Sequence, residues 1–268
     1  MLCAALATGC SHSAPPASAQ PHPLQHYASA SQLVAVASAQ QRADRFAKLH
    51  VTGVTTDNPP QSMLGDGEIS FDPSGTVMQL VQTIQPLNAT PGPAFTLLIL
   101  PNQAFLKPPP GTVSVPQGKS WFPIRQNPAS PTVTQFNQMI ESMRASADPA
   151  HTFAELGDAA SVVQATDDTL SGVPAVRYTI SLDLTKASQE RDNPAVMRAL
   201  ADMVQTGGVS DDTQLWLDGR NRPLRLVLSR TMSDETGAHS TYVVTVRYRD
   251  WGQPVNIPVP DASQVVGN

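Results

Sequence analysis

The chain has 268 residues, a net charge of −5 at neutral pH and 15% charged residues. This acidic balance lacks the basic field with which a protein attracts nucleic acid, so we expect no nucleic-acid partner. No stretch of the sequence reaches the roughly 18 consecutive apolar residues that a membrane-spanning helix needs. The length is enough for one large or two small domains.

The N-terminus carries the pattern of a bacterial lipoprotein signal. The four residues before Cys10 are Leu-Ala-Thr-Gly, and a segment rich in Ser, Ala, Pro, His and Gln follows without apolar periodicity. Such a segment cannot bury enough apolar surface to fold. We therefore expect residues 1–9 to be a residual signal segment, Cys10 to be the lipidation site, and residues 10–26 to form a lipidated, disordered tether.

The alternative is a Gly-Cys pair that occurs by chance. Only nine residues precede Cys10 and none of them is basic, whereas a secretory signal has a positively charged start and about 7–15 apolar residues. A translation start upstream of Met1 would supply the missing part. Cys3 would leave with the signal, so the mature chain would contain no disulfide.

The first half of the chain combines one helix with a series of strands. Between residues 27 and 48, apolar residues recur every three or four positions and predict an amphipathic helix, with Ser29 or Ser31 as its N-cap. From Leu49 the period changes to two, which is typical of half-buried strands. The predicted strands are residues 49–54, 65–71 and 76–84, with a β-turn at 72–75.

Residues 94–100 read Ala-Phe-Thr-Leu-Leu-Ile-Leu and are apolar on both faces. Both sides of this strand must therefore be covered. A rigid proline loop at 108–110 follows the next short segment, residues 104–107. Helical periodicity returns at 131–144, and the Asp-Pro pair at position 148 opens a further helix.

The second half returns to strands. They are predicted at residues 160–166, 173–184, 212–218, 224–230 and 239–251, with residues 168–172 and 219–221 as connecting turns and a helix at 194–205. Helix, strands, helices and strands in this order predict an α+β fold, a curved antiparallel sheet with helices on one face. Because no linker separates two cores, we expect a single domain over residues 27–266.

Four segments carry a resemblance to a known family: Asp148–Leu156, Gly172–Tyr178, Leu215–Arg225 and Tyr248–Val265. They resemble the actinobacterial LppX/LprG-type lipoproteins and their LolA-like relatives, over about residues 30–265. The resemblance implies a half-barrel whose helices lie on the concave face, with a hydrophobic cavity that holds the acyl chains of a lipid in transit across the envelope. Residues 85–131 depart from the family, since a proline-rich insert replaces a plain strand pair; it could cover or narrow the cavity.

The inward faces of the strands are the candidate ligand site. Each candidate lies on the apolar side of an alternating or doubly apolar strand. The candidates are Val51, Phe71, Leu97, Ile99, Leu226 and Val246. Two interpretations fit these faces, a lipid cavity and a packed core, because buried strands have the same pattern in both. Aromatic residues make up only 5% of the chain, so a cavity would have aliphatic walls, which suit acyl chains.

The motifs of common enzymes are missing from the sequence. It contains no Gly-x-Ser-x-Gly, no His-Glu-x-x-His and no glycine-rich phosphate loop. We therefore predict no catalytic residues, no metal site and no cofactor. Four arginines, Arg220, Arg222, Arg225 and Arg230, gather on one predicted hairpin. They could meet anionic lipid headgroups, although a solvated hairpin face is the commoner explanation.

The sequence thus favours a monomeric lipoprotein on the outer face of the cytoplasmic membrane, anchored by its N-terminal acyl chains. It would bind the acyl chains of a lipid or glycolipid in a hydrophobic cavity, for transport or presentation in the cell envelope, and would catalyse no reaction. The alternative is a structural or interaction lipoprotein with a packed core and no ligand.

Overall fold

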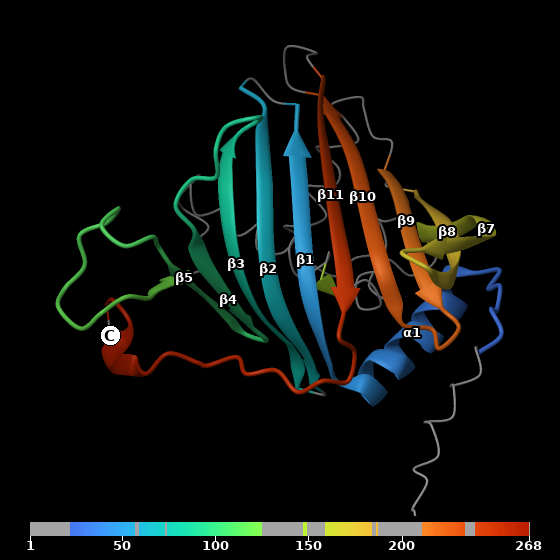
Figure 1. Ribbon diagram of the computed structural model, residues 1–268, viewed down its shortest axis with the longest axis horizontal. Coiled ribbons are helices and arrows are strands. Elements are labelled where there is room, and N and C mark those ends of the chain that lie inside the picture. Colours follow the sequence, from blue (N-terminus) through green and yellow to red (C-terminus); the bar gives the residue numbers. More distant parts are fainter. Residues whose placement is uncertain are drawn as a thin grey trace, which may run out of the picture.

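One large sheet dominates the computed structural model, which describes residues 22–56, 59–72, 74–124, 147–148, 159–183, 186, 211–233 and 239–267. Within these residues eleven strands form a single antiparallel sheet in the order β6-β5-β4-β3-β2-β1-β11-β10-β9-β8-β7 (Figure 1). The strands are β1 (Phe46–Thr55), β2 (Gln61–Asp72), β3 (Gly75–Pro86), β4 (Phe95–Leu100), β5 (Gln103–Lys107), β6 (Phe122–Ile124), β7 (Ala160–Leu170), β8 (Val173–Leu182), β9 (Asp211–Asp218), β10 (Pro223–Ser233) and β11 (His239–Arg249). The first and last strands pair in the middle of the sheet, and β6 and β7 form its two edges.

The helix α1 (Ala30–Asp44) precedes the sheet and is shorter than the sequence predicts. Ser29 caps its start, because the Ser29 side chain accepts a hydrogen bond from the backbone N–H of Gln32 at 3.3 Å. The helix ends at Arg45, whose φ of 66° turns the chain. The prediction that the helix extends to residue 48 is wrong, since β1 already begins at Phe46.

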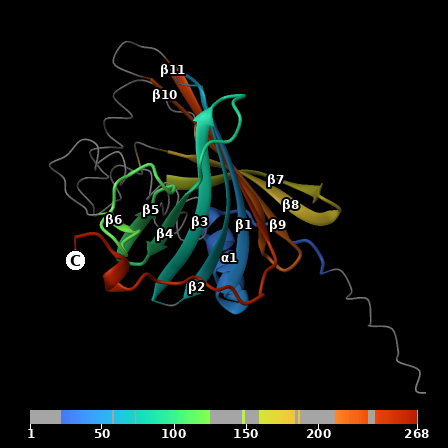
Figure 2. The ribbon, with the colours of Figure 1, turned by 60° about the vertical axis from the view of Figure 1, so that its left-hand side comes forward.

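The two faces of the sheet differ in character. Side chains on alternate residues of each strand form one large buried apolar cluster, and we call the face that carries them the core face. Leu33 and Ala37 of α1 belong to this cluster. The helix contacts both β2 and β7, which lie six positions apart, because the sheet curves around it (Figure 2). The predicted fold class, a curved antiparallel sheet with helical cover on its concave face, is confirmed for α1.

The C-terminal segment covers part of the opposite, outer face. It runs along the lower edge of the sheet back to the segment before β6 (Figure 1). There Val265 forms a parallel bridge with Trp121, and the backbone N–H of Val266 donates to the Trp121 carbonyl at 2.8 Å. Both side chains pack with Leu98, Leu100 and Phe105 in a second buried cluster. The predicted burial of both faces is thereby confirmed for residues 97–100, whereas Ala94 is exposed and Phe95 and Thr96 are partly buried.

The packed chain begins earlier than the predicted domain boundary. Leu24 packs against the main cluster, and the hydroxyl of Tyr178 donates to the Gln25 carbonyl at 2.6 Å. The His26 ring nitrogen Nε2 lies 2.7 Å from a carboxylate oxygen of Asp167. Residues 22–26, assigned by the sequence to the tether, therefore contact the folded domain through the partly buried Leu24 and through hydrogen bonds to β7 and β8.

Most predicted strands are confirmed, with differences at their ends. Residues 168–170 were expected in a turn but belong to β7, because the hairpin to β8 needs only Ser171 and Gly172. Both have positive φ, 52° and 82°, which is the geometry of a two-residue hairpin turn. The predicted helices at residues 131–144 and 194–205 and nearly all of the helix from 148 lie outside the described residues.

Candidate ligand-binding face

All six predicted wall residues lie on the core face. Val51 of β1 is directly opposite Val246 of β11, which is opposite Leu226 of β10. The same cluster contains the other candidates, Phe71, Leu97 and Ile99. All six side chains are buried, with between 0 and 6% of their surface exposed. The period-two pattern therefore assigned every one of them to a single shared face, and their contact with a ligand stays a prediction.

Glycines in the middle of this face make room for neighbouring side chains. Gly67 is opposite Leu49, and Gly65 is opposite Val51. A Cβ added at Gly65 would lie 2.9 Å from the Cβ of Gln82 and 3.2 Å from a methyl group of Leu80. Side chains of β3 thus occupy the space above the glycines, and the centre of the core face is packed.

A second part of the core face is apolar but only partly buried. On β2, Met63 continues the alternation beyond Gly65 and pairs with Ile84 of β3, which is 42% exposed. On the neighbouring strands, Phe95 and Leu106 are also partly buried. We call the following set the half-buried row: Met63, Ile84, Phe95, Leu106, Phe122 and Ile124.

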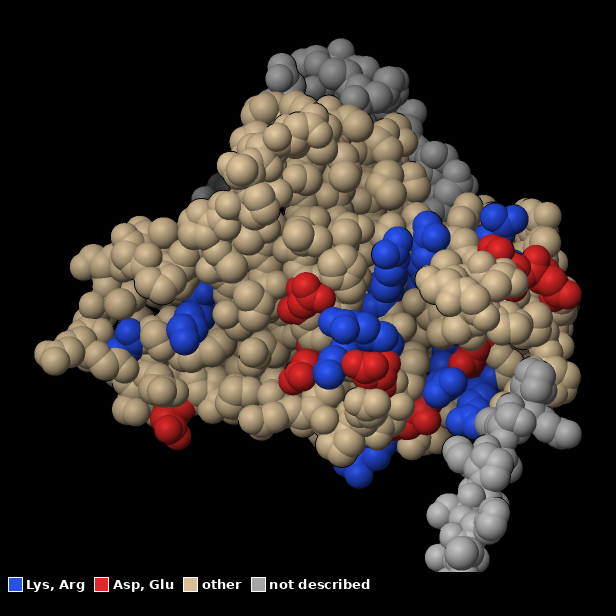
Figure 3. Space-filling model, viewed as in Figure 1, with Lys and Arg blue, Asp and Glu red and all other residues tan. Residues whose placement is uncertain are grey.

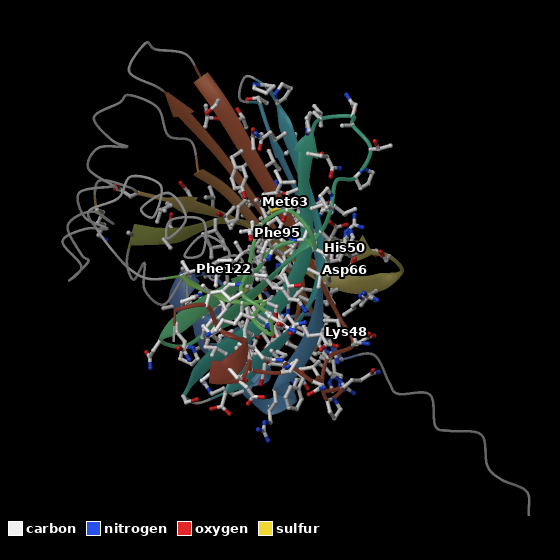
Figure 4. All side chains as sticks on the ribbon, turned by 90° about the vertical axis from the view of Figure 1, so that its left-hand side faces the viewer. Lys48, His50, Met63, Asp66, Phe95 and Phe122 are labelled. Atoms are coloured by element: carbon white, nitrogen blue, oxygen red, sulfur yellow. The ribbon has the colours of Figure 1, made fainter. Side chains whose placement is uncertain are left out.

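The half-buried row faces away from the charged surface. Figure 4 shows Met63, Phe95 and Phe122 on one side of the sheet and Lys48, His50 and Asp66 on the other. The sequence prediction missed this row, although its signal was present. Phe95 has the same parity as Leu97 within the predicted strand 94–100, and Met63 continues the parity of Phe71 one step beyond the predicted strand 65–71.

The two tyrosines buried on this face, Tyr178 and Tyr248, are not reactive groups. The Tyr178 hydroxyl already donates its hydrogen bond to Gln25, and burial raises the pKa of Tyr178 to about 12. Burial, followed by the charge of Asp148, raises the pKa of Tyr248 well above its ordinary value. Both side chains stay neutral at physiological pH and act as packing groups.

The outer face carries the ionic interactions. His50 Nδ1 lies 3.1 Å from Asp66, and Arg249 lies 3.4 Å from the same carboxylate. Lys48 pairs with Asp250 at 3.3 Å. Figure 3 shows basic side chains gathered over β10, β11 and β1, with acidic ones beside them. His50 thus projects from the face opposite to Leu49 and Val51.

Several residues singled out in the sequence lie outside the described part of the chain. Cys10 is among them, as is the side chain of Arg230. Among the described residues no group of three His, Cys, Asp or Glu side chains is placed to hold a metal ion. A search of the described helices finds none that is both long enough and apolar enough to span a bilayer.

No protein-family model and no curated protein matches the chain. Solved structures do. LprF from Mycobacterium bovis is 16% identical, with 87% of this chain and 99% of that one covered and a TM-score of 0.42. A LolA superfamily protein from Nitrosomonas europaea is 12% identical, with 87% and 96% covered and a TM-score of 0.30. MucB, in complex with MucA(peri), is 13% identical, with 88% and 59% covered and a TM-score of 0.31.

The chain has the curved antiparallel sheet and packed helix that its LolA-like resemblance implies. The similarities are distant in both sequence and superposition, and no functional conclusion follows from them.

Proposed function

We propose that this protein binds the acyl chains of a lipid or glycolipid against its core face and carries or presents that lipid, without catalysing a reaction. The observation that supports the proposal is the half-buried row, an apolar surface that continues the packed core but keeps solvent exposure. Each methylene that leaves water contributes about 0.8 kcal/mol. An acyl chain laid along this row would therefore bind with few polar contacts.

The packed centre of the core face would serve as the floor of such a site. Val51, Leu226 and Val246 are too deeply buried to be reached without movement. They would position β1, β10 and β11, whereas Met63 and Ile84 would touch the ligand. In this proposal, the six candidates named from the sequence support the surface that binds the ligand.

The acyl-chain proposal is tested by two neighbouring residues of β2 on opposite faces. Met63 belongs to the half-buried row, and Leu64, which is 40% exposed, belongs to the outer face. In titrations with a fluorescent fatty acid, Met63→Gln should weaken binding about fivefold, since it replaces an apolar contact by a polar one. Leu64→Gln should leave binding unchanged. Equal effects, or no binding by the wild type, would contradict the proposal.

We further propose that Cys10 anchors the protein to the outer face of the cytoplasmic membrane. The small residues before Cys10 and the polar segment after it support this proposal. Expressed behind a complete signal, the wild-type protein should partition into detergent, and Cys10→Ser should partition into water. Identical partitioning of the two proteins would contradict the anchor.

A packed sheet without ligand is the second candidate function, that of a structural or interaction lipoprotein. The filled space above Gly65 and Gly67 favours it. The two functions differ in one respect that can be measured: only the first predicts that a polar side chain at Met63 reduces lipid binding.

A further inference from the structure

Three arginines lie in line across the outer face. Arg177 of β8 is directly opposite Trp216 of β9, which is opposite Arg225 of β10, which is opposite Arg247 of β11. Directly opposed residues of antiparallel strands project from the same face, with their side chains in reach of one another. We call Arg177, Arg225 and Arg247 the arginine row.

Trp216 fixes the position of the central arginine. The guanidinium carbon of Arg225 lies 4.6 Å from the centre of the Trp216 ring. The ring itself is 3% exposed, and its Nε1–H donates to Asp168 at 2.9 Å. A tryptophan held in this way offers a flat, fixed support on which a planar guanidinium stacks.

One carboxylate lies near the row: the negative charge of Asp168 acts on Arg177 and Arg225 without forming an ion pair with either. Asp66 pairs with Arg249, and Asp218 pairs with Arg222 at 2.8 Å. Asp168 is engaged by Trp216. In the part of the chain that the structure describes, none of the three arginines of the row lies within ion-pair distance of a carboxylate.

Arg225 also has an unmet hydrogen-bonding need. Its Nε is buried and has no hydrogen-bond partner. Burial, and then the nearby charge of Arg247, lower the pKa of Arg225 below its ordinary value, and the charge of Asp168 offsets this only in part. Like charges directly opposite each other on paired strands are destabilising. An anion beside the two guanidinium groups would offset their mutual repulsion.

We propose that the arginine row is a binding site for a phosphate group. A phosphate presents several oxygens at once, and guanidinium groups bind such oxygens in pairs of parallel hydrogen bonds. The site lies on the face of the sheet opposite to the half-buried row, so it does not depend on the proposed acyl-chain function.

The phosphate could belong to a lipid headgroup or be free in solution. The N-terminal segment lies at one end of the row, since His26 contacts Asp167, the residue next to Asp168. A chain anchored through residues N-terminal to His26 would hold this end of the sheet close to a membrane surface. Experiments must therefore include both vesicles and inorganic phosphate.

The test uses the full chain carrying Cys10→Ser, so that no acyl anchor contributes to binding. Arg247→Gln removes one charge from the row, and Arg220→Gln is the matched control, an exposed arginine in the turn of the β9–β10 hairpin. Inorganic phosphate should raise the melting temperature of the parent and of Arg220→Gln. Arg247→Gln should lose this response, and its phosphate affinity should fall about tenfold or more.

Arg247→Gln should also melt at a slightly higher temperature than the parent in the absence of phosphate, because the repulsion with Arg225 is gone. Binding to vesicles with phosphatidic acid, but not to neutral vesicles, would assign the site to headgroups if it too is lost in Arg247→Gln. A response to phosphate alone would assign it to free phosphate. No response of the parent to either, or equal losses in Arg220→Gln and Arg247→Gln, would overturn the proposal.

Discussion

The two faces of the sheet are built from the same strands but are buried by different parts of the chain. The core face is mainly apolar, with Gln82 and Thr213 buried among its apolar residues, and is covered in part by α1. The outer face carries ion pairs and arginines, except over β4 and β5, where the C-terminal segment packs. Where a segment of the chain covers the outer face, the strands beneath it therefore carry apolar residues on both faces.

The largest expected effect separates a leucine of the core face from one of the outer face. Leu49 is fully buried, whereas Leu64 is 40% exposed. Leu49→Ala should lower the free energy of unfolding by about 2–5 kcal/mol, because it leaves a cavity in packed surroundings. Leu64→Ala should cost well under about 1 kcal/mol. Urea denaturation of both variants measures the difference, and similar losses would mean that the faces are not distinguished by burial.

An enlarged side chain tests whether the floor of the core face is packed. Leu226→Trp places a bulky ring at a side chain that is almost fully buried. In a packed floor it should cost about 1–3 kcal/mol by overpacking. Met63→Trp, in the half-buried row, should cost less, since its ring can extend toward solvent. A fully stable Leu226→Trp protein would instead indicate empty volume at the floor.

A smaller effect is expected where the tail covers the outer face. Val265 is 3% exposed against Trp121, whereas Val259 of the same segment is 56% exposed. Val265→Ala should cost about 1–2 kcal/mol for its two lost methylene equivalents. Val259→Ala should have no measurable effect. If both valines prove neutral in thermal unfolding, the tail does not stabilise the outer face of β4.

The smallest expected effect is an acid transition at the arginine row. The hydrogen bond from Trp216, followed by that from the Thr169 backbone, holds the pKa of Asp168 below its ordinary value of 3.8. A lowered carboxyl pKa stabilises the fold above that ordinary value, and this contribution is lost as the pH falls through the folded-state pKa. Near-UV circular dichroism should show the change below pH 3.8 in the wild type, whereas Asp168→Asn should lack it. A transition that persists in Asp168→Asn would assign it to another group.

The alternation of apolar residues predicted most of this fold, because a strand's inward and outward positions are fixed by its period of two. The alternation gave wrong element boundaries where two sequence patterns overlap. Phe46 and Ala47 fit the helical spacing of α1 as well as the alternation of β1, and only the turn at Arg45 decides between them. Asp168 and Thr169 have turn-like composition, but they pair with Ala175 and Pro174 in the ladder.

The sequence predicted on which face of the sheet the candidate site lies, but not which residues of that face are exposed to solvent. Leu97 and Phe95 share a strand and a side of the sheet, yet one is buried and the other is partly exposed. The difference depends on which distant segment covers each position, and a local pattern contains no information about that. For the same reason the sequence suggested a cluster of hairpin arginines but not the row, since Arg177 and Arg247 come from strands far apart in the chain.

The acyl-chain proposal is tested most directly by native mass spectrometry of the protein purified from its own host membranes. The account predicts additional mass on the folded chain that corresponds to a lipid with long acyl chains, in excess of the mass of any covalent anchor. Met63→Gln should carry less of this lipid than Leu64→Gln prepared in the same way. Wild-type protein that carries no additional lipid, and that takes up none when lipid is supplied, would contradict the account and leave the packed sheet without a ligand.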